Sequence, residues 1–77
     1  MPTVLRITGF RFFFYSDEGS EPPHIHVERS DEVAKFWLEP VELASSSGFS
    51  AKEINQLRKL VTENQTRLVE SWHEYFN

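Results

Sequence analysis

Residues 22–28 read Pro22-Pro23-His24-Ile25-His26-Val27-Glu28, and from His24 onward polar and apolar side chains alternate. Side chains two residues apart point to the same face of a β-strand. The alternation therefore predicts a strand with His24, His26 and Glu28 on one face and Ile25 and Val27 on the other. Two imidazoles on one rigid surface indicate proton transfer, anion binding or metal coordination near neutral pH.

The next alternating run covers residues 33–39 and predicts a hairpin with residues 24–29, joined around residues 30–32. Its register is set by keeping the apolar side chains of both strands together, because a slip of one residue would turn a strand over. We expect residue 25 to pair with 38 and residue 27 with 36. On the other face, Glu28 then lies opposite Lys35, His26 opposite Trp37 and His24 opposite Glu39.

An earlier hairpin is predicted over residues 4–15. The run is rich in Phe and Ile, which favour strands, and Gly9 interrupts it. With Thr8 and Gly9 as the loop, Arg6 lies opposite Arg11. The pairs Ile7 with Phe10 and Leu5 with Phe12 then belong to an apolar face completed by Phe14.

The C-terminal third has the pattern of a helix. Ser50 and Glu53 match the capping box that begins a helix, and apolar residues follow at spacings of three and four. Asn64 interrupts this stripe, so one long helix and two helices with a kink near Asn64 both fit. Before the helix, residues 41–43 are a candidate fifth strand and residues 45–48 a loop.

These elements predict a single α+β domain over residues 1–77. We expect a small antiparallel sheet of two hairpins, with four or five strands, and the C-terminal helix packed on one face. A chain of 77 residues has a small core, and seven phenylalanines supply much of its buried area.

Composition excludes several classes of protein. The absence of cysteine excludes disulfides and thiolate metal sites. The net charge of −4 provides no overall basic field for nucleic acid. No stretch approaches 18 consecutive apolar residues and no signal peptide is recognisable, so we expect a soluble, cytoplasmic protein without a membrane partner.

A helix covers only one face of a sheet, and the other face has an unusual composition. If both hairpins share one sheet, the uncovered face carries aromatic residues, histidines and cations where simple polar residues are usual: Arg6, Arg11, Phe13, Tyr15, His24, His26, Glu28, Lys35 and Trp37. Such patches mark binding surfaces, although packing against a second copy or a loop would also explain the aromatics. The facing Arg6 and Arg11 suit an anion between them, or an acid such as Glu18 or Glu21 from the neighbouring loop.

Three interpretations of His24 and His26 fit the sequence. The rings could cap the sheet, with His24 against Glu39 and His26 against Trp37. They could form an acid/base or anion-binding pair, oriented by Glu39 and Glu28. They could be two metal ligands, with a third from Glu28, Glu39 or His73. Because no third ligand is obvious, we expect no metal and no cofactor.

The chain resembles a family of small prokaryotic proteins, the domain of unknown function 4160. The resemblance rests on Met1-Pro2-Thr3-Val4-Leu5-Arg6-Ile7, on residues 9–16 and 21–27, on Ala34-Lys35-Phe36-Trp37-Leu38, and on Trp72-His73-Glu74-Tyr75-Phe76. It implies a gene beside that of a second small protein, in an arrangement similar to a toxin–antitoxin pair. It supplies no catalytic residues.

Two hypotheses of function follow. In the first, a toxin–antitoxin-type protein binds a cognate partner or RNA through the uncovered face. If it is catalytic, His24 and His26 would exchange protons in metal-independent RNA cleavage, Arg6, Arg11 and Lys35 would stabilise the phosphorane, and Tyr15 or Trp37 would stack a base. In the second, the protein is a non-enzymatic interaction module, antitoxin-like or regulatory. The partner would be the product of the neighbouring gene, and a homodimer is a further candidate.

Overall fold

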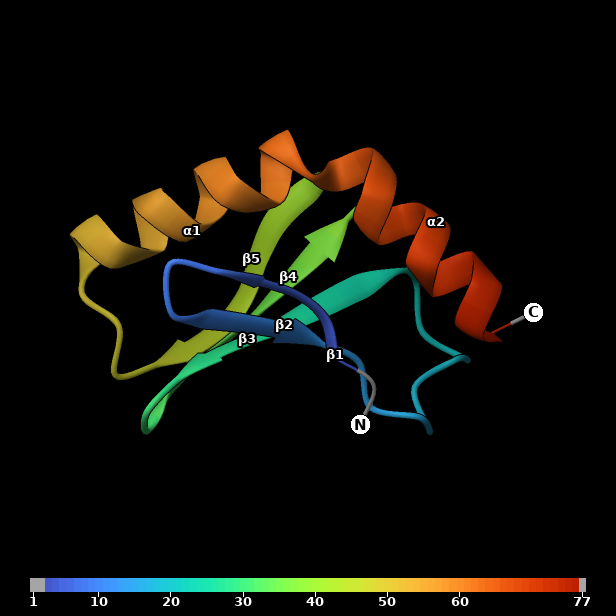
Figure 1. Cartoon of the computed structure of the whole chain (residues 1–77), viewed down its shortest axis with the longest axis horizontal. Coiled ribbons are helices and arrows are strands. Elements are labelled where there is room, and N and C mark those ends of the chain that lie inside the picture. The colour runs from blue at the N-terminus through green and yellow to red at the C-terminus, as the bar shows by residue number, and fades with distance from the viewer. Residues whose placement is uncertain (1–2, 77) are drawn as a thin grey trace.

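The computed structural model describes residues 3–76 and confirms the α+β prediction. Five antiparallel strands form one sheet in the order β1-β2-β3-β4-β5, and two helices cover one of its faces (Figure 1). The elements are β1 (Thr3–Ile7), β2 (Phe10–Phe13), β3 (His24–Arg29), β4 (Glu32–Leu38), β5 (Val41–Ser47), α1 (Ala51–Glu63) and α2 (Gln65–Phe76). Neither helix within residues 3–76 has the length and apolar character needed to cross a membrane.

The first hairpin has the predicted register. Ile7 pairs with Phe10, Arg6 with Arg11 and Leu5 with Phe12. Thr8 and Gly9 have φ angles of 47° and 86°. Two successive positive φ values match the twist of a two-residue hairpin loop, which is why a glycine is needed here.

The register of the β3–β4 hairpin differs from the prediction by two residues. Ile25 pairs with Phe36 and Val27 with Ala34, and the loop consists of Ser30 and Asp31, with Ser30 at a φ of 54°. A shift of two residues keeps every side chain on its face, so the hydrophobic pattern could not exclude it. As a result the predicted partners on the uncovered face are wrong: His24 lies opposite Trp37, His26 opposite Lys35 and Glu28 opposite Val33.

The fifth strand is longer than predicted. It continues through Ser47, so the three serines expected in a loop are paired with β4, Ser45 opposite Lys35 and Ser47 opposite Val33. Serine is not a strong strand former, but pairing with a formed neighbouring strand outweighs a weak local preference. An irregularity between Lys35 and Phe36 accommodates an extra residue of β5 at this point.

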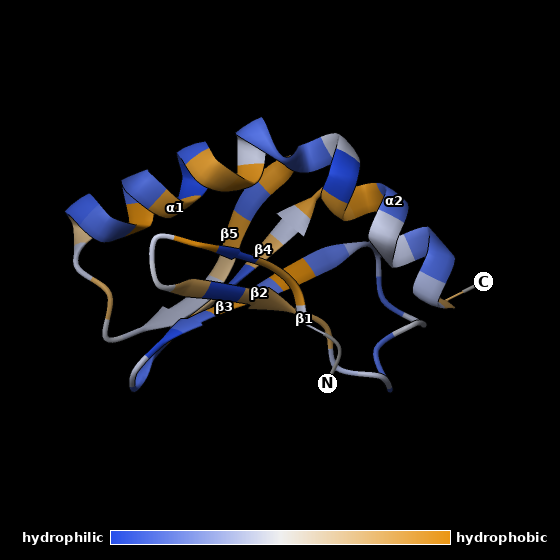
Figure 2. Cartoon of the chain, viewed as in Figure 1, coloured by the Kyte–Doolittle hydropathy of each residue, from blue (hydrophilic) through white to orange (hydrophobic). Residues whose placement is uncertain are grey.

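The core lies between the sheet and the helices. On α1 and α2 the hydrophobic residues lie on the side of the ribbon that faces the sheet, and the outer side is mostly hydrophilic (Figure 2). Fully buried members come from both layers: Phe10, Phe12, Phe14, Ile25, Val27, Phe36, Leu38, Leu57, Val61 and Leu68. The prediction of an apolar face carrying Phe10, Phe12 and Phe14 is therefore confirmed.

The helical segment is divided at Asn64. Asn64 has φ −109° and ψ 14°, and its side chain donates a hydrogen bond to the Leu60 carbonyl at 2.8 Å. The break lets the two helices follow the twisted sheet, with α1 packed on β4 and β5 and α2 on β3 and β4 (Figure 1). Of the two arrangements that fitted the sequence, the structure has the interrupted one.

Candidate functional site

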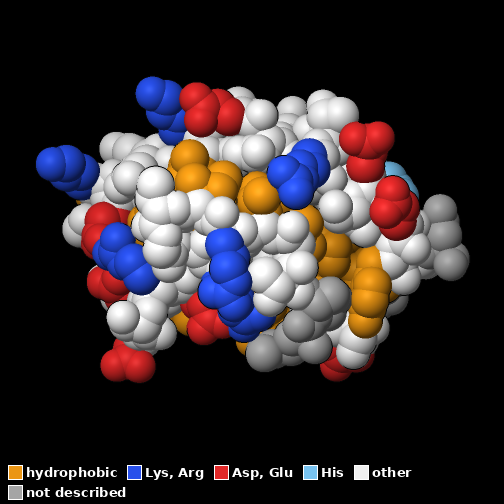
Figure 3. All heavy atoms as spheres, in the orientation of Figure 1, with side chains coloured by type: hydrophobic (Ala, Val, Ile, Leu, Met, Phe, Trp, Pro, Cys, Tyr) orange, Lys and Arg blue, Asp and Glu red, His pale blue; other side chains and the backbone are white. Residues whose placement is uncertain are grey.

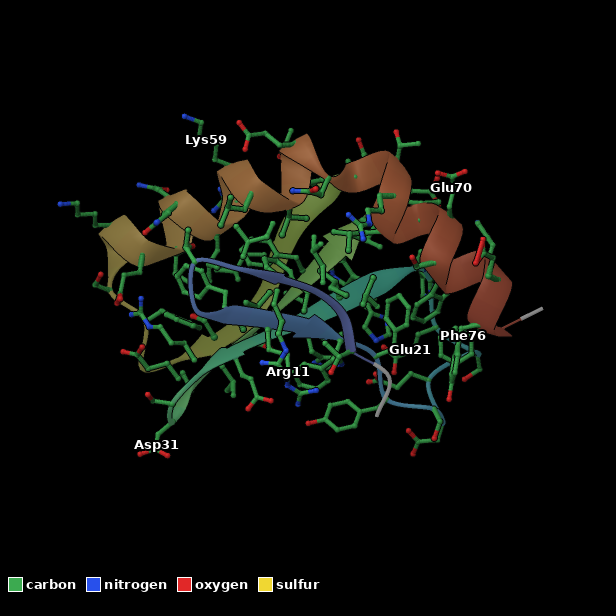
Figure 4. All side chains as sticks on the ribbon, viewed as in Figure 1. Arg11, Glu21, Asp31, Lys59, Glu70 and Phe76 are labelled. Carbon is green, nitrogen blue, oxygen red and sulfur yellow. The ribbon has the colours of Figure 1, made fainter. Side chains whose placement is uncertain are left out.

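The uncovered face of the sheet brings most of the predicted site residues together. Phe13 stacks on His26, with ring centroids 5.5 Å apart, and the Tyr15 ring meets His26 edge-on at 4.7 Å. The Arg11 guanidinium lies 4.1 Å above the Phe13 ring. Figure 4 shows Arg11 extending from β2 on the side away from the helices. The aromatic residues and histidines of this face thus pack on one another.

The cations of this face are largely paired with carboxylates. Arg11 forms an ion pair with Glu28 of the adjacent strand, and its Nη1 also donates to Thr3 Oγ1 at 3.0 Å. Lys35 Nζ lies 2.7 Å from Glu21 Oε1 and 4.6 Å from the centre of the Trp37 ring. On the side drawn in Figure 3, Lys and Arg side chains are spread over the surface, some of them beside Asp and Glu, and do not gather in one basic patch.

Glu28 and Glu39, which were predicted to orient the histidines, have other neighbours in the structure. Glu28, expected to orient a histidine, is the partner of Arg11. Glu39 is exposed and lies beyond the end of β4, while Trp37 takes the place opposite His24. Arg6 faces Arg11 as expected and is exposed, and it makes no ion pair within residues 3–76.

His24 is the one buried polar side chain among the described residues, with no exposed area. Its ring lies 4.7 Å from the Trp72 ring of α2 and 5.6 Å from the Trp37 ring. His24 Nδ1 is 3.0 Å from the Pro22 carbonyl oxygen. A carbonyl can only accept a hydrogen bond, so Nδ1 carries the proton and Nε2 points the other way.

Both histidines meet a carboxylate that sequence reasoning did not assign to them. Glu18 Oε1 lies 2.9 Å from His24 Nε2 and 2.8 Å from His26 Nε2. Glu18 belongs to the acidic loop between β2 and β3, and the loop returns over the start of β3, where both histidines lie. The signal available in the sequence was that the acids of this loop lie only a few residues before the first residues of β3.

The environment shifts the pKa of two of these groups. Burial would raise the pKa of Glu18, but contacts from His24 and His26 outweigh burial and lower it. Burial lowers the pKa of His26, and Glu18 opposes this only in part. At neutral pH the surroundings therefore favour an ionised Glu18 and a neutral His26.

A trough of about 350 Å³ crosses the uncovered face from β2 to β5. Tyr15 and Val33 lie in it with 40% and 46% of their surface exposed. The residues that line it are Phe13, Tyr15, His26, Val27, Val33, Ala34, Lys35, Ser45, Ser46 and Ser47, of which Val27 and Ala34 have their side chains buried in the core. The serines on β5 were not predicted as part of the site, because the sequence indicated a loop there.

Comparison with known proteins gives one result. No curated protein and no solved structure matches the chain. A family model matches residues 9–73, which include β2 to β5, α1 and most of α2. The chain belongs to the family described as Domain of unknown function (DUF4160).

Proposed function

We propose that this protein is a non-enzymatic interaction module that binds a protein partner through the trough on the uncovered sheet face. The observation that carries the proposal is the exposure of Tyr15 and Val33, at 40% and 46%, on a face that would otherwise meet water. Exposed apolar side chains gathered in a concave surface are typical of interaction sites.

The trough favours an extended polypeptide over a compact ligand. It crosses β2 to β5 and ends at Ser45–Ser47, on a strand at the edge of the sheet. An edge strand offers backbone donors and acceptors to an incoming strand, and serine side chains leave room for it. The partner would add a strand beside β5 and place alternate apolar side chains in the trough. The neighbouring gene implied by the family resemblance is the candidate source of that partner.

The charges of the face support a protein partner more than RNA. Arg11 and Lys35 are already paired with Glu28 and Glu21, so binding a phosphate there requires breaking an ion pair. Affinity for nucleic acid depends mainly on cations that neutralise phosphates. Proton exchange by both histidines would also require His24 to reach substrate, and His24 has no exposed area. RNA cleavage stays a prediction and ranks second.

The test is co-purification of the chain with the product of the neighbouring gene, with a matched pair of tyrosine variants. Tyr15 lies in the trough and Tyr75 lies on α2, and their exposed fractions are similar, 40% and 45%. We expect Tyr15→Ala to weaken binding by about 10-fold or more, the loss of over 1.4 kcal/mol expected for an aromatic anchor. Tyr75→Ala should bind like the wild type.

Equal binding by the two variants would contradict the trough as the docking site. Growth arrest by the chain alone, abolished by His26→Ala with the fold retained, would contradict the module and establish the RNA-cleavage hypothesis instead.

A further inference from the structure

We propose that Glu18, His24 and His26 form a binding site for a divalent transition-metal ion such as Zn²⁺. One oxygen of Glu18 and one nitrogen of each histidine converge, all within 4.8 Å of one another. Two histidines and a carboxylate are a ligand set that proteins use for Zn²⁺ and other ions of this class. The metal site shares His26 with the trough, but its assignment does not rest on the partner-binding function.

The expectation of no metal rested on the lack of a third ligand. The candidates considered from the sequence do not serve: Glu28 is paired with Arg11, Glu39 lies beyond β4, and His73 is exposed on α2. Glu18 supplies the missing ligand from the loop before β3. Three protein ligands leave one position of a tetrahedral ion for water.

His24 provides the independent observation that points to a cation. Its Nε2 is buried and has no hydrogen-bond partner among the described residues, although Glu18 Oε1 is 2.9 Å away. Because Nδ1 donates to the Pro22 carbonyl, Nε2 of the neutral ring has only a lone pair. A lone pair aimed at a carboxylate oxygen is unfavourable unless a positive charge lies between them.

That charge is either a proton on Nε2 or a metal ion. A proton on His24 Nε2 satisfies the Glu18–His24 contact alone, and the hydrogen bond between Glu18 Oε1 and His26 Nε2 at 2.8 Å needs a second proton, on His26 Nε2. A metal ion satisfies all three atoms at once. The bond from His24 Nδ1 to a backbone carbonyl is the outer-shell contact that fixes a metal-ligating histidine in the required tautomer.

The two contacts that Glu18 makes with the histidines suit an ion after a small adjustment. Two ligand atoms about 2.1 Å from a tetrahedral ion lie about 3.4 Å apart. The two contacts of Glu18 are 2.8 and 2.9 Å, so its carboxylate would withdraw by roughly half an ångström. Glu18 lies in a loop, between β2 and β3, where such a shift disturbs no strand pairing.

The experiment uses the full chain, stripped with a chelator and titrated with Zn²⁺ by calorimetry. We expect one ion per chain. Glu18→Gln and His26→Gln should each weaken binding by more than the 10–100-fold typical of losing an outer-shell contact. Two matched controls should bind like the wild type: Asp17→Asn changes an exposed carboxylate of the same loop, and His73→Gln changes an exposed histidine.

A second measurement separates the metal ion from the proton. Nitrogen NMR of His24 at neutral pH should show a proton on Nδ1 and, with Zn²⁺ added, none on Nε2. Zinc binding that is absent, or unchanged in Glu18→Gln, would overturn the metal site, and a protonated Nε2 that persists with Zn²⁺ would do the same. Circular dichroism of each variant checks that the fold is retained.

Discussion

At the scale of residues, neighbouring side chains of a strand lie in two environments, the core under the helices and the uncovered face of the sheet. Phe36 of β4 is fully buried under the helices, whereas its neighbour Trp37 lies on the uncovered face beside His24 and Lys35. The two aromatic rings therefore contribute differently to stability. Phe36 fills the core, and Trp37 mainly screens one side of a polar cluster.

The first prediction compares these neighbours. Phe36→Ala should lower the free energy of unfolding by about 3–5 kcal/mol, the usual loss for a buried aromatic ring. Trp37→Ala should lower it by clearly less, because Trp37 is only partly buried. Urea denaturation followed by circular dichroism measures both losses, and equal losses would contradict the assignment of the two faces.

The separation of the faces could be predicted from the sequence, because alternation with period two is a local property. The position of Glu18 against His24 and His26 could not, because it depends on the path of a loop. The pairing of Arg11 with Glu28 could not be predicted for another reason: it joins β2 to β3, and the sequence does not say that these hairpins are adjacent. The facing pairs within the first hairpin could be predicted from the sequence, because its two-residue loop fixes the register.

At the scale of elements, the start of α1 is fastened to the sheet. Ser50 Oγ accepts from the Glu53 backbone N–H at 3.1 Å, and the Glu53 carboxylate accepts from the Ser50 N–H at 3.0 Å. Glu53 also pairs with Arg29 at the end of β3, and Arg29 pairs with Glu32 of β4. The capping box was visible in the sequence. The link from Glu53 to Arg29 and Glu32 could not be predicted. It depends on the β3–β4 register, and the hydrophobic pattern does not distinguish registers that differ by two residues.

The second prediction concerns the pH dependence of this link. Hydrogen bonds from Ser50 and Arg29 lower the pKa of Glu53 below its ordinary value of 4.5. A carboxyl with a lower pKa in the folded state stabilises the fold above the unfolded-state pKa, and the contribution is lost as the pH falls below it. Wild-type protein should therefore lose more stability than Glu53→Gln as the pH is lowered from 5 to 3.

Thermal unfolding across that pH range measures the difference. Glu63→Gln is the matched control, because Glu63 is an exposed carboxylate at the other end of α1. This control should keep the full acid-induced loss. If Glu53→Gln showed the same acid-induced loss of stability as the wild type, the contacts of Glu53 would contribute nothing to stability.

At the scale of the whole molecule, one residue joins the layers. The Trp72 ring of α2 packs against Phe14 at 5.3 Å, Phe76 at 4.2 Å and His24 at 4.7 Å. It covers the end of β3 where the proposed metal site lies. Gly19 of the acidic loop also lies against this end of α2, where a Cβ would meet the Phe76 ring at 2.7 Å. The C-terminal end of α2 therefore contacts the core, the acidic loop and the proposed metal site.

The third prediction follows from this position. Trp72→Ala should lower the free energy of unfolding by about 3–5 kcal/mol. At roughly 0.05–0.15 kcal/mol per residue, a domain of 77 residues has only about 4–12 kcal/mol in total. A large part of the population should then unfold on mild heating, which far-UV circular dichroism follows. A melting curve close to that of the wild type would show that α2 does not support the sheet.

The strand order of the sheet has a consequence for how the chain acquires its structure. Every strand pairs with the one directly before it, so the strand pairings are local in the sequence, and local topologies fold fast. On the ribosome, strands could pair as they emerge, in the order of synthesis. Their cover comes last, because residues 51–76 hold both helices. Until those residues leave the exit tunnel, Phe10, Phe12 and Phe36 face water. A nascent chain that has left the tunnel only as far as Gly48 would therefore be prone to aggregation.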